Sequence, residues 1–209
     1  MNKQNIYHYL MIQGDVDKKT DMFIDECINE VKKHALFKCI HAEVHLSHTP
    51  LKIDELDLML ESEDLKQHLG ECREAILIAC TLGSEVDRKL KYYQLYDMGK
   101  AVIFDAVCNA YIEECTDAYE ENLNLKKRTF RLCPGYGDIP LKYNQDISKY
   151  LNIEKHLRVT INEGGLFVPL KTMVGIIGLG VDSKKTCLTC VNMNTCQLRN
   201  EGKTCYVKK

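Results

Sequence analysis

The sequence contains no run of about 18 apolar residues, the length that a membrane-spanning helix requires. Its first ten residues, MNKQNIYHYL, lack the apolar stretch of a signal peptide. Lys and Arg number 28 against 30 Asp and Glu, and the resulting net charge of -2 gives no general attraction to nucleic acid or to an anionic membrane. We therefore expect a cytoplasmic protein that binds its partners at local sites.

The common phosphate-binding and hydrolase motifs are also missing. No GxxxxGK[ST] sequence occurs, and the GIIGLG stretch that begins at Gly175 has the wrong spacing for a dinucleotide fingerprint and predicts a strand instead. No Ser-His-Asp arrangement is recognisable, and Cys133 could act as a nucleophile only with a base that the sequence does not identify. Catalytic residues therefore stay unassigned.

The chain is long enough to bury a core, because it has 209 residues of which 45% are hydrophobic. The patterns predict helices at residues 20–35, capped by Thr20 or Asp21, and at residues 84–97, capped by Ser84. Further segments are a strand at 36–46, one or two short helices at 53–70, a fully buried strand at 74–83 and a short helix at 145–157.

The longest predicted helix covers residues 97–124 and carries an apolar stripe from Val102 to Tyr111. Asp105, Asn109 and Glu113 follow one another at four-residue spacing and form a polar line beside this stripe. The line is either a solvated edge or a face that borders a cleft. Because its spacing suits both, the sequence leaves the two interpretations open.

Two more strands are predicted at 157–161 and 173–180, joined by a turn at Gly164 and Gly165. The helices and strands follow no regular βαβ rhythm. This order favours an α+β fold with a mixed or antiparallel sheet flanked by helices. We assign residues 1–183 to this domain and residues 184–209 to a Cys-rich tail.

The sequence has eleven cysteines, which the cytoplasm would keep reduced. Seven are scattered singly and are expected to be small buried apolar residues. The other four have the spacing C-x2-C-x5-C-x8-C, which suits zinc or an iron–sulfur cluster, although a reduced tail without metal is the alternative. These four are Cys187, Cys190, Cys196 and Cys205. His41, His45 and His48 could form a second metal site, or they could be exposed histidines of a strand.

The stretch RLCPGYGDIP, residues 131–140, contains two of the four prolines of the chain. Pro134 and Gly135 predict a turn, because proline presets φ and glycine accepts a positive φ. Arg131 could bind a carboxylate or phosphate through two hydrogen bonds, and Tyr136 could stack on a planar ring. The stretch is therefore either a ligand-binding loop or a structural turn beside an exposed arginine.

RLCPGYGDIPL, together with TLGSEVDRKL, FDAVCNAYIEE and TINEGGLFVPLKTMVGIIGLG, resembles the activation domain of vitamin B12 (cobalamin)-dependent methionine synthase. The similarity is greater to stand-alone activation subunits, whose tails carry a C-x2-C…C-x2-R pattern matched by Cys187, Cys190, Cys196 and Arg199. The resemblance covers roughly residues 75–199, and R-x-x-P-G-Y is its most specific element.

The resemblance implies S-adenosylmethionine as a cofactor that remethylates cob(II)alamin to methylcobalamin after one-electron reduction. Arg131 would hold the carboxylate of the methionyl group, and Tyr136 with the backbone of Cys133, Pro134 and Gly135 would line the same pocket. An acidic contact to the ammonium group corresponds to Glu113, or to Asn109 one turn earlier. Glu163 matches a glutamate of the family.

The resemblance also implies a corrinoid-binding methionine synthase as partner, because a cobalamin lower-ligand motif of the type D-x-H-x-x-G is absent here. Flavodoxin or ferredoxin would donate the electron, and a cluster in the tail could relay it, with a structural zinc as the rival. Two other functions remain open. One is a non-catalytic module, stabilised by a metal ion, that docks on a corrinoid protein and does not bind S-adenosylmethionine. The other is a reductive activator of a different corrinoid methyltransferase.

Overall fold

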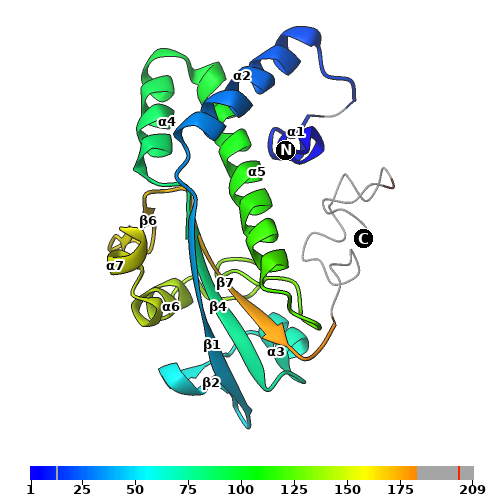
Figure 1. Ribbon diagram of the computed structural model, residues 1–209, viewed down its shortest axis with the longest axis vertical. Helices are drawn as coiled ribbons and strands as arrows, with labels where there is room; N and C mark the ends of the chain where they lie inside the picture. Colours follow the sequence, from blue (N-terminus) through cyan, green and yellow to red (C-terminus); the bar gives the residue numbers. More distant parts are fainter. Residues whose placement is uncertain (13, 183–201, 203–209) are drawn as a thin grey trace. The chain divides into compact units, whose positions relative to one another are not determined.

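A computed structural model describes residues 1–12, 14–182 and 202 (Figure 1). The four tail cysteines and Arg199 lie outside these residues, as does the expected domain 184–209 apart from residue 202. The helices are α1 Lys3–Tyr9, α2 Lys18–His34, the short 3-10 helix η1 Asp54–Leu56, α3 Glu63–Leu69, α4 Ser84–Tyr96, α5 Met98–Asn122, α6 Tyr143–Leu151 and α7 Ile153–Leu157. The strands are β1 Lys38–His48, β2 Leu51–Ile53, β3 Leu58–Met59, β4 Glu74–Thr81, β5 Thr160–Ile161, β6 Phe167–Val168 and β7 Thr172–Leu179.

Five of the strands form one sheet in the order β3-β2-β1-β4-β7, and β5 pairs with β6 in a second, two-stranded sheet. The register is antiparallel between β1 and β2, where Leu46 faces Ile53, and between β2 and β3. The predicted α+β fold class is confirmed. Strand β4 is the apolar run expected at residues 74–83, and seven of its eight residues are buried.

The turn at Gly164 and Gly165 was expected to join the strand at 157–161 to the strand at 173–180, and the second of these two strands is wrong. Gly165 has a φ of +76° and its N–H donates to the carbonyl of Asn162 at 3.0 Å, so a turn does form there. The turn joins β5 to β6, in which Thr160 faces Val168, and β7 belongs to the larger sheet. The sequence pattern missed β6 because this strand has only two residues.

The chain divides into two compact units. Unit 1 comprises Met1–Ile40, Ala79–Asn124 and Asn152–Met173, and unit 2 comprises His41–Ile78, Leu125–Leu151 and the segment that begins at Val174. Each unit is therefore built from segments that are distant in the sequence.

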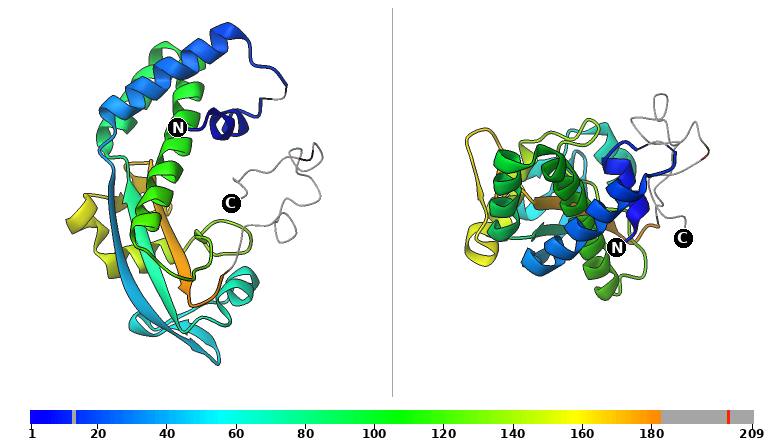
Figure 2. Two further views of the ribbon diagram at one scale, coloured as in Figure 1. Left: turned by 45° about the vertical axis from the view of Figure 1, so that its right-hand side comes forward. Right: turned by 90° about the horizontal axis from the view of Figure 1, so that it is seen from above.

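The core of unit 1 lies around α5, which α1, α2 and α4 all contact (Figure 2). Helix α2 buries Ile24, Cys27, Ile28 and Val31, whose i, i+3, i+4, i+7 spacing places them on one face of the helix. Phe104 of α5 is fully buried and packs edge-on against the ring of Tyr93 from α4, with the centroids 5.4 Å apart. Apolar burial thus fixes the three longer helices of the unit.

Two helix starts and one side chain differ from the prediction. Asp17, and not Thr20 or Asp21, caps α2 by accepting from the N–H groups of Lys19 and Thr20. Gly83, with a φ of +82°, occupies the N-cap of α4 instead of Ser84. Val102 is 55% exposed, whereas Ala106, Val107 and Ala110 of the expected stripe are buried together with Phe104.

Unit 2 contains most of the larger sheet together with α3 and α6. The region 53–70, expected to be helical, forms helix only at η1 and α3, because β2 and β3 pair with each other on either side of η1. The fully buried Tyr143 at the start of α6 ties these elements together: its hydroxyl donates to the carbonyl of Met59 and accepts from the N–H of Glu61, both at 3.0 Å. One phenol thus satisfies two backbone groups.

Removal of this hydroxyl should destabilise unit 2. We expect Tyr143→Phe to lower the free energy of unfolding by about 1 kcal/mol, because two partly buried backbone groups lose their partner. Tyr150→Phe is the matched control, since Tyr150 lies on the same helix and is 40% exposed. Chemical denaturation of the two variants measures the difference, and equal stability of both would contradict the structural interpretation.

No helix within the described part of the chain is both long and apolar enough to cross a membrane.

Candidate functional site

Arg131 lies in unit 2 and packs along β7. The neighbouring Leu132 exchanges two backbone hydrogen bonds with Ile176, at 2.9 and 2.8 Å, which brings the segment alongside the strand. Gly175 leaves the space that the arginine stem fills, because a Cβ at this glycine would lie 2.5 Å from Cγ and 2.7 Å from Cδ of Arg131. Arg131 is buried, with only 8% of the residue exposed. Of the two alternatives for this stretch, the structural turn beside an exposed arginine therefore does not hold as stated, because Arg131 is buried.

The PGYG stretch forms the predicted turn. The N–H of Tyr136 donates to the carbonyl of Cys133 at 3.2 Å, and Gly135, at the third position of the turn, has a φ of +91°. The N–H of Gly135 donates to the carbonyl of Ile139 at 2.9 Å, so a second bond closes the loop on itself. These two N–H groups are engaged within the loop, whereas Tyr136 as a residue is 66% exposed.

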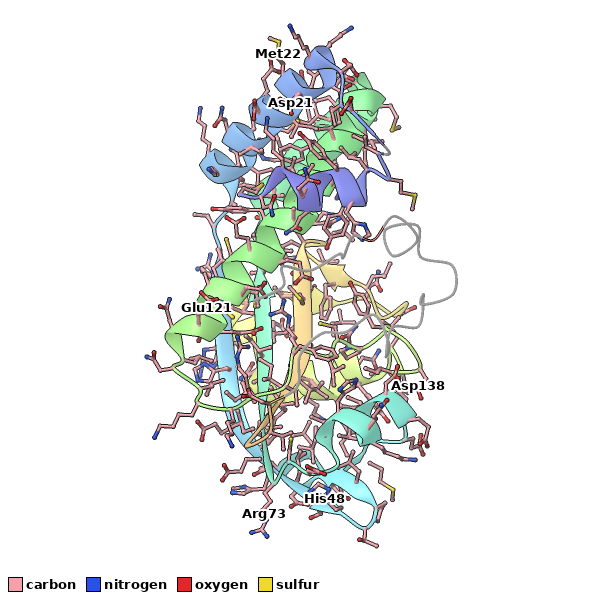
Figure 3. The ribbon with its side chains drawn as sticks, turned by 90° about the vertical axis from the view of Figure 1, so that its right-hand side faces the viewer. Asp21, Met22, His48, Arg73, Glu121 and Asp138 are labelled. Carbon is pink, nitrogen blue, oxygen red and sulfur yellow. The ribbon has the colours of Figure 1, made fainter. Side chains whose placement is uncertain are left out.

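Asp138 anchors the end of this loop to the start of α3. Its carboxylate accepts from the Ser62 hydroxyl and from the N–H groups of Glu63, at 2.6 Å, and Asp64, at 3.2 Å. Ser62 in turn accepts from the N–H of Leu65, so both side chains cap one helix. Figure 3 shows Asp138 beside this helix. The hydrogen bond from Ser62, followed by those from the backbone, holds the pKa of Asp138 below its ordinary value of 3.8.

This anchor predicts a pH-dependent stability. Because the folded-state pKa of Asp138 is lower than the unfolded-state value, its contribution is complete above about pH 4 and is lost as the pH falls through the lowered pKa. We expect Asp138→Asn to lower the Tm by a few degrees at pH 7 and to differ less from the wild type at pH 3. Glu71→Gln, an exposed residue of unit 2, is the charge-matched control. A Tm difference that is the same at both pH values would contradict the prediction.

In unit 1, the predicted polar line of α5 meets a lysine. The ammonium group of Lys171 lies 2.6 Å from an oxygen of Asp105 and donates to Oδ1 of Asn109 at 2.7 Å. The side chain of Lys171 is only 11% exposed. Asp105 and Asn109 therefore belong to a partly buried ion-pair network and not to a solvated edge.

The other two sequence-predicted residues of unit 1 lie in different elements. Glu113 is half-buried on α5, one turn after Asn109, and Glu163 is exposed in the turn between β5 and β6. The eight predicted cofactor-binding residues thus fall into two groups. Unit 2 holds Arg131 with residues 133–136, and unit 1 holds Asn109, Glu113 and Glu163.

Within the described residues, no three His, Cys, Asp or Glu side chains gather so that they could hold a metal ion. His45 pairs with Glu55 at 2.7 Å, and Nε2 of His48 lies 2.6 Å from the carbonyl of Cys72. Of the seven scattered cysteines, Cys27, Cys72, Cys80 and Cys108 are buried as expected, whereas Cys39, Cys115 and Cys133 are half-buried. Burial raises the pKa of the Cys27 thiol to about 12, which makes it unreactive.

Sequence reasoning missed three residues that position the predicted ones. Gly175 was assigned only to a strand, Asp138 was part of the quoted loop without a function, and Lys171 was not singled out. The glycine in an otherwise apolar strand was an available signal, because such a glycine often marks a close approach of another group. The contacts of Asp138 and Lys171 are 74 and 62 residues away in the sequence, at Asp64 and Asn109, and left no local signal.

No protein-family model matches the sequence, and no curated protein matches it. The structure is similar to a solved structure described as "Crystal Structure of the MetH Reactivation Domain bound to AdoHcy". The TM-score is 0.65 with 13% sequence identity, and the match covers 97% of this chain and 83% of the other. The chain therefore has an α+β fold of the kind found in that reactivation domain.

Proposed function

We propose that this protein binds S-adenosylmethionine and reactivates a corrinoid-dependent methyltransferase, in particular methionine synthase, by reductive methylation of cob(II)alamin. The observation that carries the proposal is the R-x-x-P-G-Y turn on a reactivation-domain fold, with the arginine stem seated on Gly175. AdoHcy, which the similar structure binds, is the part of S-adenosylmethionine that remains after methyl transfer.

Arg131 supports the proposal through its chemistry and its placement. A guanidinium can bind a carboxylate through two parallel hydrogen bonds, and a stem already ordered by packing loses less entropy on binding. The stem is ordered here because its Cγ and Cδ occupy the place of a Cβ at Gly175. The residues present therefore fit the carboxylate of a methionyl group.

The loop after Arg131 supports the proposal in a second way. Its internal hydrogen bonds and the anchor at Asp138 give it one conformation, and the exposed ring of Tyr136 offers a face on which a planar base can stack. In this proposal Cys133, Pro134 and Gly135 line the pocket through backbone carbonyl groups and van der Waals contacts. A ligand loop needs this preorganisation, because each group ordered on binding lowers the affinity.

S-adenosylmethionine would supply an electrophilic methyl group on a sulfonium sulfur. The protein's own contribution is to bind and orient this cofactor, while the corrinoid arrives on a partner and the electron comes from flavodoxin or ferredoxin. Glu113, or Asn109 one turn earlier, is the candidate for the ammonium group, and Glu163 matches a glutamate of the family. Cys187, Cys190, Cys196 and Cys205 are proposed to hold zinc or an iron–sulfur cluster in the tail.

The proposal is tested with the full chain, purified without oxygen, and a cobalamin-bound methionine synthase that lacks its own activation domain. S-adenosylmethionine and a low-potential reductant are added, and the visible spectrum reports the conversion of cob(II)alamin to methylcobalamin. We expect conversion only when the protein and S-adenosylmethionine are both present. Iron and zinc are assayed on the same sample to identify the tail metal.

Two outcomes would overturn the proposal. If calorimetry detects no S-adenosylmethionine binding either alone or with the partner, but the protein still binds the corrinoid enzyme, it is a docking module. If the protein converts the corrinoid of another methyltransferase and not that of methionine synthase, the proposed partner is wrong. The same methionine synthase without its activation domain, incubated without this protein, is the control for the conversion.

A further inference from the structure

Two cysteines of unit 1 lie in contact across neighbouring strands. Cys39 is the second residue of β1, and Cys80 is the seventh residue of β4, the next strand of the sheet. Their Sγ atoms are 2.9 Å apart, although 41 residues separate them in the sequence. Both are thiols in this structure. The fold has therefore already brought two sulfur atoms from distant positions to within the reach of a covalent bond.

The surroundings of the pair differ on its two sides. Cys80 is buried, and the Thr116 hydroxyl of α5 lies 3.3 Å from its sulfur. Cys39 is only half-buried, so a small molecule can reach it more easily. Tyr119 of α5 also borders the pair: burial raises the pKa of Tyr119, and the two cysteines raise it further. The neighbouring phenol thus stays neutral at physiological pH.

We propose that Cys39 and Cys80 form a reversible, redox-active disulfide that covalently joins β1 to β4. The proposal is independent of S-adenosylmethionine binding, because neither cysteine belongs to the predicted cofactor site. Intracellular disulfides, where they occur, are usually transient and redox-sensing, and a contact pair of which one thiol is half-buried suits such a reaction.

The oxidant is a small-molecule disulfide such as oxidised glutathione. The Cys39 thiolate attacks one of its sulfur atoms, a mixed disulfide forms, and one small thiol leaves. The Cys80 thiolate then attacks Sγ of Cys39, and the second small thiol leaves. The two protein thiols lose two electrons and two protons, and the small disulfide gains them as two thiols. The Thr116 hydroxyl can donate a hydrogen bond to the Cys80 thiolate that makes the second attack.

The test uses the full chain, treated with oxidised glutathione, alkylated and digested with trypsin without reduction. Cleavage after Lys38 and Lys52 and after Arg73 and Arg88 gives peptides 39–52 and 74–88, each with a single cysteine. We expect mass spectrometry to find these two peptides linked, and reductant to separate them. The Tm should rise by about 5–10 °C on oxidation, because the bond restrains a long loop of the unfolded chain.

Two variants make the result specific. Cys39→Ser, at a half-buried position, should retain the fold and lose the oxidation-dependent rise in Tm. Cys115→Ser, a half-buried cysteine of α5 in the same unit, should keep both the linked peptides and the rise. A link from Cys80 to Cys115, a mixed disulfide that persists on Cys39, or unlinked peptides after treatment would each overturn the proposal.

Discussion

Replacement of Arg131 by alanine is expected to weaken S-adenosylmethionine binding by about 100-fold or more. Loss of a buried, hydrogen-bonded charge opposite a carboxylate typically costs several kcal/mol, and each factor of ten corresponds to about 1.4 kcal/mol. The stem of Arg131 is fixed against Gly175, and only 8% of the residue is exposed, so a carboxylate bound to it would be shielded from water. Calorimetry with the oxygen-free protein measures the change.

Two further variants separate charge from packing at this position. Arg131→Lys keeps a positive charge but lacks the planar guanidinium with its parallel N–H donors. It should lose less affinity than the alanine variant. Arg73→Ala removes an exposed arginine of the same unit and should bind as the wild type does (Figure 3). An Arg131→Ala protein that is folded and binds with unchanged affinity would rule out the proposed carboxylate contact.

Replacement of Gly175 by alanine is expected to disturb both the fold and the site. The new Cβ would lie within 2.7 Å of both Cγ and Cδ of Arg131, so the arginine stem must leave its place. Overpacking of this kind typically costs about 1–3 kcal/mol of stability. Since the same movement displaces the guanidinium, S-adenosylmethionine affinity should fall by about tenfold or more. Denaturation and calorimetry on one sample measure the two effects.

The matched control for this variant lies three residues further along β7. A Cβ at Gly178 would come within 2.6 Å of Cys72 and 2.8 Å of Leu69, but would not meet Arg131. Gly178→Ala should therefore lower stability and leave cofactor affinity unchanged. In the double variant with Arg131→Ala, the stability loss caused by Gly175→Ala should shrink, because the clashing stem is gone. Additive losses would show that the clash does not involve Arg131.

The hydrophobic pattern identified most elements of this protein because burial acts over a few residues. Helix α2 has four apolar residues at helical spacing, and β4 is an unbroken apolar run, so both were predictable. The β5–β6 hairpin was not, because strands of two residues have too few side chains to show a pattern. The caps of α2 and α4 differed from prediction by one or more residues, since several neighbouring residue types can cap.

The candidate site was predictable to a smaller extent. The turn at Pro134 and Gly135 follows from local backbone preferences, and the structure has it with the expected positive φ. The assignment of Arg131, Tyr136 and residues 133–135 to a cofactor rests on the resemblance to a family and stays a prediction. The same holds for Asn109, Glu113 and Glu163, and for the tail cysteines outside the described residues.

The sequence by itself determined the fold class, the helices and strands with more than a few residues, and the turn of the PGYG loop. Each of these depends on preferences and burial patterns among neighbouring residues. Only the tertiary structure decided that Gly175 holds the stem of Arg131, that Asp138 anchors the loop to α3, and that Cys39 touches Cys80. These contacts join residues 41 to 75 positions apart, or depend on the absence of a side chain. Apart from the glycine in β7, no local pattern indicates these contacts, because they form only once tertiary folding has brought distant segments together.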